Sequence, residues 1–191
     1  MNITKIDVPQ MIQHLDENAL ITGTNVKMYT KYLKEYASAY ANPEAALAIG
    51  DTLAYTVRGI EDLEDKSPDA LSWGCTYLEP LTVDGEFTIT RGHFHQDRNC
   101  PEYYLCASGT GYLIKWDGED EVILEKMTRN SLHLIDGKYA HRMVNVGDTQ
   151  MAVFACYPTK ASQNYAAIEQ KGFPIRLFSE NGEVKIVEVN N

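Results

Sequence analysis

Hydrophobic spacing differs between the first 50 residues and the rest of the chain. Within residues 28–41 (MYTKYLKEYASAYA), aromatic and apolar residues recur at the spacing of one helix face, at Tyr29, Tyr32, Leu33 and Tyr36. Asn42 and Pro43 follow directly, and because the residue before a proline disfavours helical backbone, this pair predicts the end of the helix. Residues 1–50 are therefore expected to form a partly helical arm.

From about residue 51 onward, short runs rich in Val, Ile, Thr, Tyr and Phe alternate with turn signals such as Asp84-Gly85 and Asn181-Gly182. We predict strands at residues 86–90, 102–107, 111–115, 122–125, 131–135, 142–145, 151–157, 175–178 and 184–189. Residues 164–171 predict a short helix that ends at Gly172. Many short strands are typical of a sandwich or barrel, so we expect a mainly β fold with a barrel over residues 51–191.

Length and charge narrow the class of protein. The 191 residues suit one domain with an arm, and a net charge of -10 disfavours nucleic acid and anionic membranes as partners. We find neither a long apolar run typical of a membrane helix nor an apolar signal-peptide core at the N-terminus. The cysteines have no C-x-x-C spacing, which predicts free thiols in a reducing compartment and a cytoplasmic protein: Cys75, Cys100, Cys106 and Cys156.

The stretch GHFHQDRNCPEYY (92–104) contains a candidate metal site. Residues two apart on a strand share a face, so His93 and His95 point to one side. Glu102 opens the next predicted strand, and a hairpin returns it beside them; closure of a barrel brings His141 to the same place. Three imidazoles and one carboxylate suit a divalent first-row metal with open positions for water or substrate. The other two histidines have no such company and are predicted to be structural: His14 and His133.

The order of these residues resembles the cupin pattern, with HxH, Glu102, Gly109 and a later pair, His141 and Asn145. The gap between His95 and Glu102 is longer than in most cupins. Asn130 and Asp136 stand where the second cupin motif usually has Gly and Pro.

These departures resemble one branch, the cupin-type glucose-6-phosphate isomerase of archaea and a few bacteria. The resemblance covers residues 74–190 and rests on TRGHFH (90–95), EYY (102–104), GTGYLI (109–114), AHRMVNVGD (140–148), CYPTKASQNYAAIEQKGF (156–173) and ENGEVKIVEV (180–189). It implies a single cupin (double-stranded β-helix, jelly-roll) barrel and a homodimer.

The resemblance also implies roles for individual residues. His93, His95, Glu102 and His141 match the metal ligands of the family, and the metal is expected to be one Fe(II) per subunit, with Mn, Ni, Co or Zn as substitutes. Other positions match its contacts to the sugar phosphate: Thr76, Thr90, Gly92, Tyr104, Tyr157, Gln163 and Tyr165. Gln163 stands where the family often has His, and an amide cannot carry a charge or shuttle a proton near neutral pH.

The implied reaction interconverts glucose 6-phosphate and fructose 6-phosphate, in glycolysis and gluconeogenesis. Glu102 is the candidate proton carrier between C1 and C2 through an enediolate, and a hydride shift with Glu102 as ligand alone is the alternative. Three other functions stay open: an Fe(II)-dependent dioxygenase, a non-enzymatic sugar-binding cupin, and an isomerase of another sugar phosphate such as mannose 6-phosphate. Arg91 and Lys160 flank these motifs and are expected to be solvated charges, with anion steering as the alternative.

Overall fold

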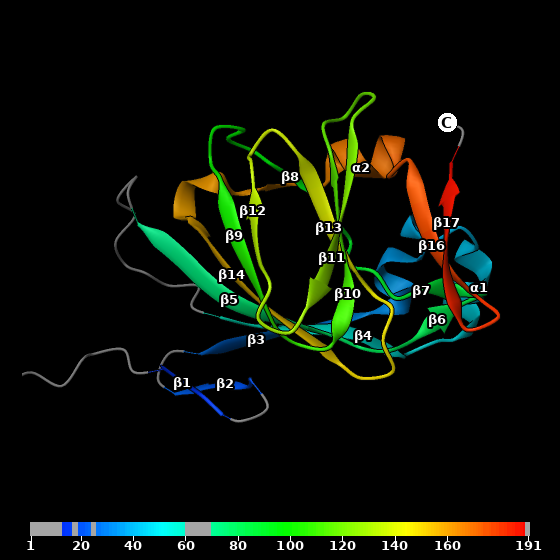
Figure 1. Ribbon diagram of the computed structural model, residues 1–191, viewed down its shortest axis with the longest axis horizontal. Coiled ribbons are helices and arrows are strands. Elements are labelled where there is room, and N and C mark those ends of the chain that lie inside the picture. Colours follow the sequence, from blue (N-terminus) through cyan, green and yellow to red (C-terminus); the bar gives the residue numbers. More distant parts are fainter. Residues whose placement is uncertain (1–12, 17–18, 24–25, 60–69, 190–191) are drawn as a thin grey trace, which may run out of the picture.

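The computed structural model describes residues 13–16, 19–23, 26–59 and 70–189. Its largest sheet has six antiparallel strands (Figure 1). Their order is β12 (Leu132–Ile135), β9 (Glu102–Ser108), β14 (Met151–Pro158), β5 (Leu71–Leu78), β4 (Leu53–Gly59) and β3 (Lys27–Tyr32).

A second sheet, of three antiparallel strands, stands opposite the six-stranded one in Figure 1. Its order is β11 (Val122–Thr128), β10 (Thr110–Trp116) and β13 (Ala140–Asn145). Buried side chains from both sheets form one hydrophobic core, among them Leu78, Cys106, Leu113, Met127 and Met143. The expected mainly β fold is therefore confirmed.

Smaller sheets extend this core. A four-stranded sheet has the order β17 (Glu183–Glu188), β16 (Ile175–Glu180), β7 (Glu86–Phe87) and β6 (Thr82–Val83). Two pairs complete the described strands: β1 (Gln13–Leu15) with β2 (Ile21–Gly23), and β8 (Phe94–His95) with β15 (Gln163–Asn164). A short 3-10 helix η2 (Thr159–Ala161) precedes β15.

The alternation of side chains along β9 positions the functional residues. Glu102, Tyr104 and Cys106 are buried, whereas Tyr103 between them is 49% exposed. Residues two apart share one face of a strand, so the glutamate and Tyr104 point the same way. The sequence pattern of this strand therefore presents a carboxylate and a phenol to the interior.

The predicted helix over residues 28–41 is wrong in its first part. Lys27–Tyr32 forms β3, which pairs with β4, and only Leu33–Ala39 is helical, as the 3-10 helix η1. Tyr and Thr fit a pleated surface, and pairing with β4 satisfies the backbone of this segment. The aromatic spacing in this segment is compatible with both structures, and the neighbouring strand decides.

Asn42 and Pro43 begin a helix, α1 (Pro43–Ala48), rather than ending one. The Asn42 side chain accepts a hydrogen bond from the Ala45 N–H at 3.0 Å, and Pro43 occupies the first turn, where it needs no N–H partner. The pair that we interpreted as a stop is therefore an N-cap.

Other predicted elements agree to within a few residues, with two differences. The strand at 86–90 is shorter, because β7 ends at Phe87 and Ile89 makes an isolated bridge to Val144. Strands β4 and β5 had not been predicted, and neither had the short strands β1, β2, β6 and β15. The short helix is confirmed as α2 (Ala166–Lys171), followed by Gly172 with a φ of 71°.

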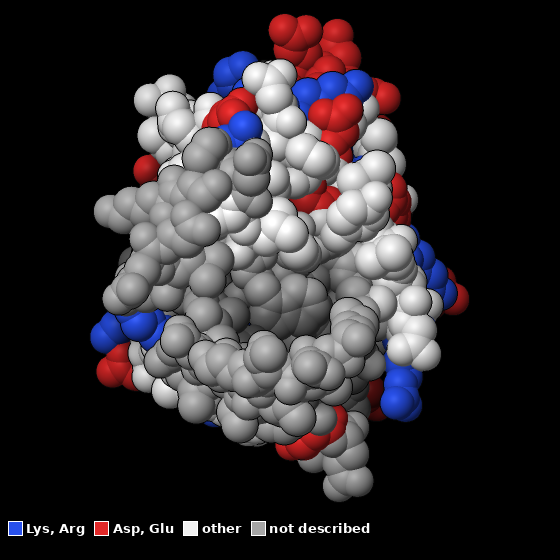
Figure 2. All heavy atoms as spheres, turned by 90° about the vertical axis from the view of Figure 1, so that its left-hand side faces the viewer, with Lys and Arg blue, Asp and Glu red and all other residues white. Residues whose placement is uncertain are grey.

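The division into an arm and a barrel at residue 50 stays a prediction. No helix in the described part of the chain is long and apolar enough to cross a membrane. The four cysteines are free thiols. On the face shown in Figure 2, the described Lys and Arg side chains lie scattered at the periphery, beside acidic ones.

Candidate metal centre and substrate cavity

Three segments bring the predicted metal ligands together. His95 lies in β8, Glu102 opens β9, and His141 lies in β13. His93 is fixed by an isolated bridge to His141, in which each backbone N–H donates to the other residue's carbonyl, at 3.2 and 3.0 Å. Phe94, between the two histidines, is buried with its ring 6.1 Å from that of Trp116. The expected alternation across the HxH motif is therefore present.

We call His93, His95, Glu102 and His141 the histidine cluster. Each offers one ligand atom, and the four atoms lie within 4.8 Å of one another. Glu102 Oε2 is 3.0 Å from His95 Nε2 and 3.1 Å from His141 Nε2. A single ion can be reached by all four side chains from such positions.

Backbone carbonyls orient two of the imidazole rings. His95 Nδ1 donates to the carbonyl oxygen of Cys100 at 2.7 Å, and His141 Nδ1 faces that of Tyr139 at 3.4 Å. Because a carbonyl only accepts, these contacts keep a proton on Nδ1 and direct Nε2 toward the cluster. Metal-binding histidines are commonly held in this way.

The electrostatics favour the metal-binding forms of His93 and Glu102, whereas at His95 the effect of burial, which would lower the pKa, is outweighed by Glu102, which raises it. Burial, reinforced by the neighbouring His141, holds the pKa of His93 well below its usual value. Burial alone would raise the pKa of Glu102, but the close imidazoles of His141 and His95 outweigh it and lower that pKa to about 2. A neutral imidazole and an ionised carboxylate are the forms that coordinate metals.

One ring nitrogen of the histidine cluster has no hydrogen-bond partner among the described residues. His141 Nε2 is buried and makes no hydrogen bond to a described residue, although Glu102 Oε2 is near. Leaving a buried polar atom without a partner is costly, and an ion at the centre of the cluster would take its lone pair. The residues therefore fit a divalent first-row metal.

A cavity of about 130 Å³ opens beside the histidine cluster. His93, Glu102 and His141 line it, whereas His95 does not. Every residue predicted to contact the sugar phosphate also lines it: Thr76, Thr90, Gly92, Tyr104, Tyr157, Gln163 and Tyr165. Residues from positions 76 to 165 in the sequence thus converge on one hollow, which we call the substrate cavity.

A family model described as glucose-6-phosphate isomerase (GPI) matches residues 30–191. The chain belongs to the glucose-6-phosphate isomerase family. It is 36% identical over 138 residues to the glucose-6-phosphate isomerase of Pyrococcus horikoshii, covering 72% of both chains. It is 31% identical over 165 residues to that of Thermococcus litoralis, covering 85% of this chain and 86% of the relative. The expected archaeal-type cupin branch is therefore confirmed.

In this isomerase family member, several lining residues escaped the sequence reasoning. They are Tyr55, Val57, Gly74, Met143 and Ala155, and Arg91, which was expected to be a solvated charge, lines the cavity too. The first three lie on β4 and β5, which had not been predicted. The Arg91 guanidinium lies 4.2 Å from the centre of the Tyr165 ring and pairs with Glu169, so Arg91 belongs to the cavity wall. Lys160 pairs with Asp97 at 3.9 Å and does not line the cavity.

The two histidines predicted to be structural have different outcomes. His133 is buried, and both of its ring nitrogens have protein partners, Glu125 at 2.7 Å and Ser131 at 2.8 Å. It is therefore a satisfied core histidine, as predicted. His14 lies in β1, and its interpretation stays a prediction.

Proposed function

We propose that this protein is a metal-dependent isomerase that interconverts glucose 6-phosphate and fructose 6-phosphate. The observation that carries the proposal is the opening of one cavity onto both the histidine cluster and a wall of hydroxyl groups. The cluster suits a cation that polarises sugar oxygens. Hydroxyl groups suit a phosphate and a polyhydroxylated chain, because they donate hydrogen bonds without adding a full charge.

The backbone around Gly92 supports a phosphate site. Gly92 has a φ of 75°, and a Cβ there would lie 2.7 Å from Phe173 and 3.0 Å from Arg142, so only glycine fits. No hydrogen bond from the Gly92 N–H to another described residue occurs. Thr90 Oγ1 accepts from the Met143 N–H at 3.0 Å and keeps its own proton to donate. Both groups are therefore available to an anion.

Two tyrosines complete the proposed substrate contacts. Burial, with the nearby Glu102 charge, raises the pKa of Tyr104 well above its usual value, so it stays a neutral phenol that can donate. Tyr165 donates to Gln163 Oε1 at 3.1 Å. Gln163 thus orients a substrate-facing tyrosine, a role that requires no proton transfer.

The isomerisation needs a base near C1 and C2. The metal, when bound, supplies electrophilic stabilisation of negative charge on the substrate oxygens. We propose that Glu102 carries the proton between the two carbons, after its carboxylate shifts from its ligand position as substrate binds. The Nε2 atoms of His95 and His141 lie 3.0 and 3.1 Å from that carboxylate and would remain to hold the ion.

The proposal extends to the metal and the assembly. We propose Fe(II) in the cell, with Mn, Ni, Co or Zn able to replace it, because availability and geometry select among these ions. We also propose a cytoplasmic homodimer. Strand β12 ends the six-stranded sheet and exposes Leu132 and Leu134, at 64% and 51%, and exposed strand edges are usually covered.

A coupled assay tests the reaction. Fructose 6-phosphate is supplied to chelator-stripped protein, and glucose 6-phosphate is measured before and after Fe(II) or Mn(II) is added. We expect activity to vanish on stripping and return with metal. Metal binding without isomerisation would contradict the proposed function and favour a dioxygenase, tested by oxygen consumption. Mannose 6-phosphate in the same assay tests the range of substrates.

Isotope retention tests the role of Glu102. Glucose 6-phosphate carrying deuterium at C2 is converted in ordinary water, and the deuterium left at C1 of the product is measured. Proton transfer through Glu102 allows exchange with solvent, so part of the label is lost. Full retention would instead support a hydride shift and leave Glu102 as a ligand alone.

A further inference from the structure

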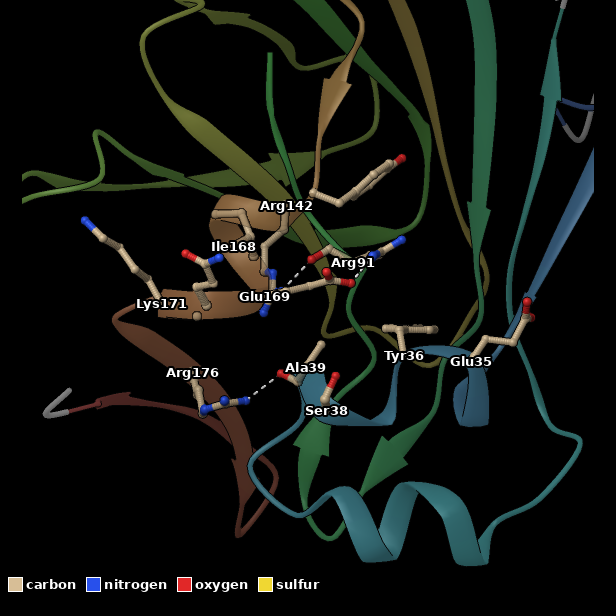
Figure 3. A pocket seen from close by; sticks show the side chains of 13 residues that line it. Glu35, Tyr36, Ser38, Ala39, Arg91, Arg142, Ile168, Glu169, Lys171 and Arg176 are labelled. Atoms are coloured by element: carbon tan, nitrogen blue, oxygen red, sulfur yellow. Dashed lines mark hydrogen bonds and ion pairs between the residues drawn. The ribbon is translucent and has the colours of Figure 1, made fainter. Parts of the chain in front are cut away.

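A second cavity, of about 240 Å³, adjoins the substrate cavity and is the one drawn in Figure 3. It lies between α2 and η1, and it shares two wall residues, Arg91 and Tyr165, with the substrate cavity. Four cationic side chains line it: Arg91, Arg142, Lys171 and Arg176. We call it the arginine cavity. Such a gathering is unexpected in a chain with a net charge of -10.

The carboxylates near this cavity already have partners. Glu169 forms an ion pair with Arg91, and Glu35 pairs with Lys31 at 3.3 Å. Arg176 is held by Glu86 Oε1 at 2.8 Å. These pairs offset the charges of Arg91 and Arg176, and Glu86 also lies near enough to attract Arg142 without forming an ion pair with it.

The innermost cation is Arg142, which is 3% exposed. Its guanidinium donates to the carbonyl oxygen of Arg91 at 2.6 Å and lies 4.2 Å from the centre of the Phe173 ring. Its Nε is buried without a hydrogen-bond partner, and no carboxylate of a described residue forms an ion pair with it. Burying an unpaired charge is costly unless something compensates it.

A guanidinium stays protonated in proteins, so Arg142 is a cation. In Figure 3 its guanidinium points toward the space between Glu169 and the Ser38–Ala39 backbone. The hydroxyl of Ser38, an exposed residue, is on the same side. The arginine cavity therefore offers a buried positive charge and a hydroxyl donor to one space.

We propose that the arginine cavity binds a phosphate-type oxyanion, separately from the substrate cavity. Inorganic phosphate and the phosphate group of a monoester share the required chemistry. A guanidinium presents its N–H groups as a planar fork that matches phosphate oxygens, and Arg142 lacks the carboxylate that would compete for them.

The two cavities are joined by Arg91. Its carbonyl accepts from Arg142, its guanidinium lies against Tyr165, and Gly92 follows it in the chain. An anion on Arg142 therefore acts on the same backbone that holds the proposed substrate phosphate. Any effect on substrate affinity must be reciprocal, because coupling between two binding sites is the same in both directions.

Ser38→Glu tests the proposal, because it tethers a carboxylate at the mouth of the arginine cavity. Ser38→Gln is the matched control, with the same size and no charge. Calorimetric titration with inorganic phosphate should find one fewer phosphate per chain in Ser38→Glu than in Ser38→Gln and the unaltered protein. Isomerase activity in phosphate-free buffer should be equal in all three, because Ser38 does not line the substrate cavity.

Equal phosphate stoichiometry in both variants would overturn the proposal while leaving the isomerase assay unaffected. If Ser38→Glu does not fold, Gln170→Glu serves instead, since Gln170 is exposed and lines the same cavity. Repeating the titration with methyl phosphate identifies the source. Loss of the second site for inorganic phosphate alone points to the free ion, and loss for both extends the site to monoesters.

Discussion

Two clusters in this protein both contain histidine and glutamate but differ in how their polar atoms are satisfied. The histidine cluster gathers three imidazoles around Glu102. A second group, which we call the lysine cluster, consists of Lys115, Glu125, Ser131 and His133. Glu125 holds Lys115 with one carboxylate oxygen and His133 Nδ1 with the other, and His133 Nε2 contacts Ser131 Oγ.

The difference lies in the partners of each polar atom. In the lysine cluster both ring nitrogens of His133 and both oxygens of Glu125 have protein partners, and Lys115 balances the charge. In the histidine cluster two imidazoles lie close to one carboxylate oxygen, and His141 Nε2 makes no hydrogen bond to any residue that the structure describes. Histidine and glutamate in proximity do not define a metal site. A metal site is indicated where ligand atoms converge and the protein leaves one of them without a hydrogen bond.

The largest expected effect is loss of activity in His141→Ala. Mutating a residue that hydrogen-bonds to a metal ligand lowers metal affinity or activity by about 10- to 100-fold. Removing a proposed ligand itself should therefore lower both by more than about 100-fold. Bound metal, measured by elemental analysis, should fall together with activity. His133→Ala is the matched control, because it removes a buried imidazole from the other cluster. Equal metal content and activity in the two variants would contradict the proposed difference between the histidine cluster and the lysine cluster.

Glu102→Gln should lower kcat by roughly 10²- to 10⁴-fold, the usual contribution of a general base. The amide keeps the size of the side chain and cannot accept the substrate proton. Glu125→Gln makes the same chemical change in the lysine cluster and should leave kcat near that of the unaltered enzyme. Steady-state kinetics with excess metal checks both variants. A comparable loss of kcat in Glu125→Gln would contradict the structural role of its cluster.

Stability should respond in the opposite order. Glu125→Gln removes the ion pair of Lys115, which is 6% exposed, and leaves that ammonium without its counter-charge. Leaving a buried polar group unsatisfied costs about 1–3 kcal/mol. Urea denaturation of the metal-free proteins should find a larger loss of unfolding free energy in Glu125→Gln than in Glu102→Gln. The reverse order would show that the histidine cluster is the main structural support.

The smallest effect is a change in acid sensitivity. Burial opposes ionisation of Glu125, but the hydrogen bonds from Lys115 and His133 outweigh it and lower its pKa below 4.5. A carboxyl with a lowered folded-state pKa stabilises the protein above its unfolded pKa, and that stability is lost as pH falls. As the pH falls from about 6 to about 3, the unfolding free energy of Glu125→Gln should therefore decrease less than that of the unaltered protein. Urea denaturation at each pH measures this difference. Parallel pH profiles would exclude this contribution.

Many of the strands could be predicted from alternation, because β-branched and aromatic runs separated by glycine turns have few other structures available. Residues 28–41 could not, since their aromatic spacing suits a helix and a strand equally. The choice depends on β4, an element distant from the pattern itself. Asn42-Pro43 was misread for a similar reason, because the pair is compatible with the start and the end of a helix.

The site was more predictable than its surroundings. HxH, Glu102 and His141 are chemically distinctive, and the family resemblance supplied the cavity residues that line the wall. Tyr55 and Val57 carried no comparable signal, because apolar and aromatic residues on a strand are usually core. Arg142 was predicted only as a strand residue. Its burial beside Gly92 depends on tertiary packing that no local pattern records.

The pairing of β15 with β8 has a consequence for the design of chimeras between this protein and its relatives. Gln163 lies opposite His95 in a ladder of two residue pairs, so the strand with a proposed substrate contact is registered against the strand with a proposed metal ligand. This backbone ladder fixes where the side chain of residue 163 lies relative to His95. The unit to exchange is the whole stretch from Tyr157 to Gly172, together with the ladder that aligns it.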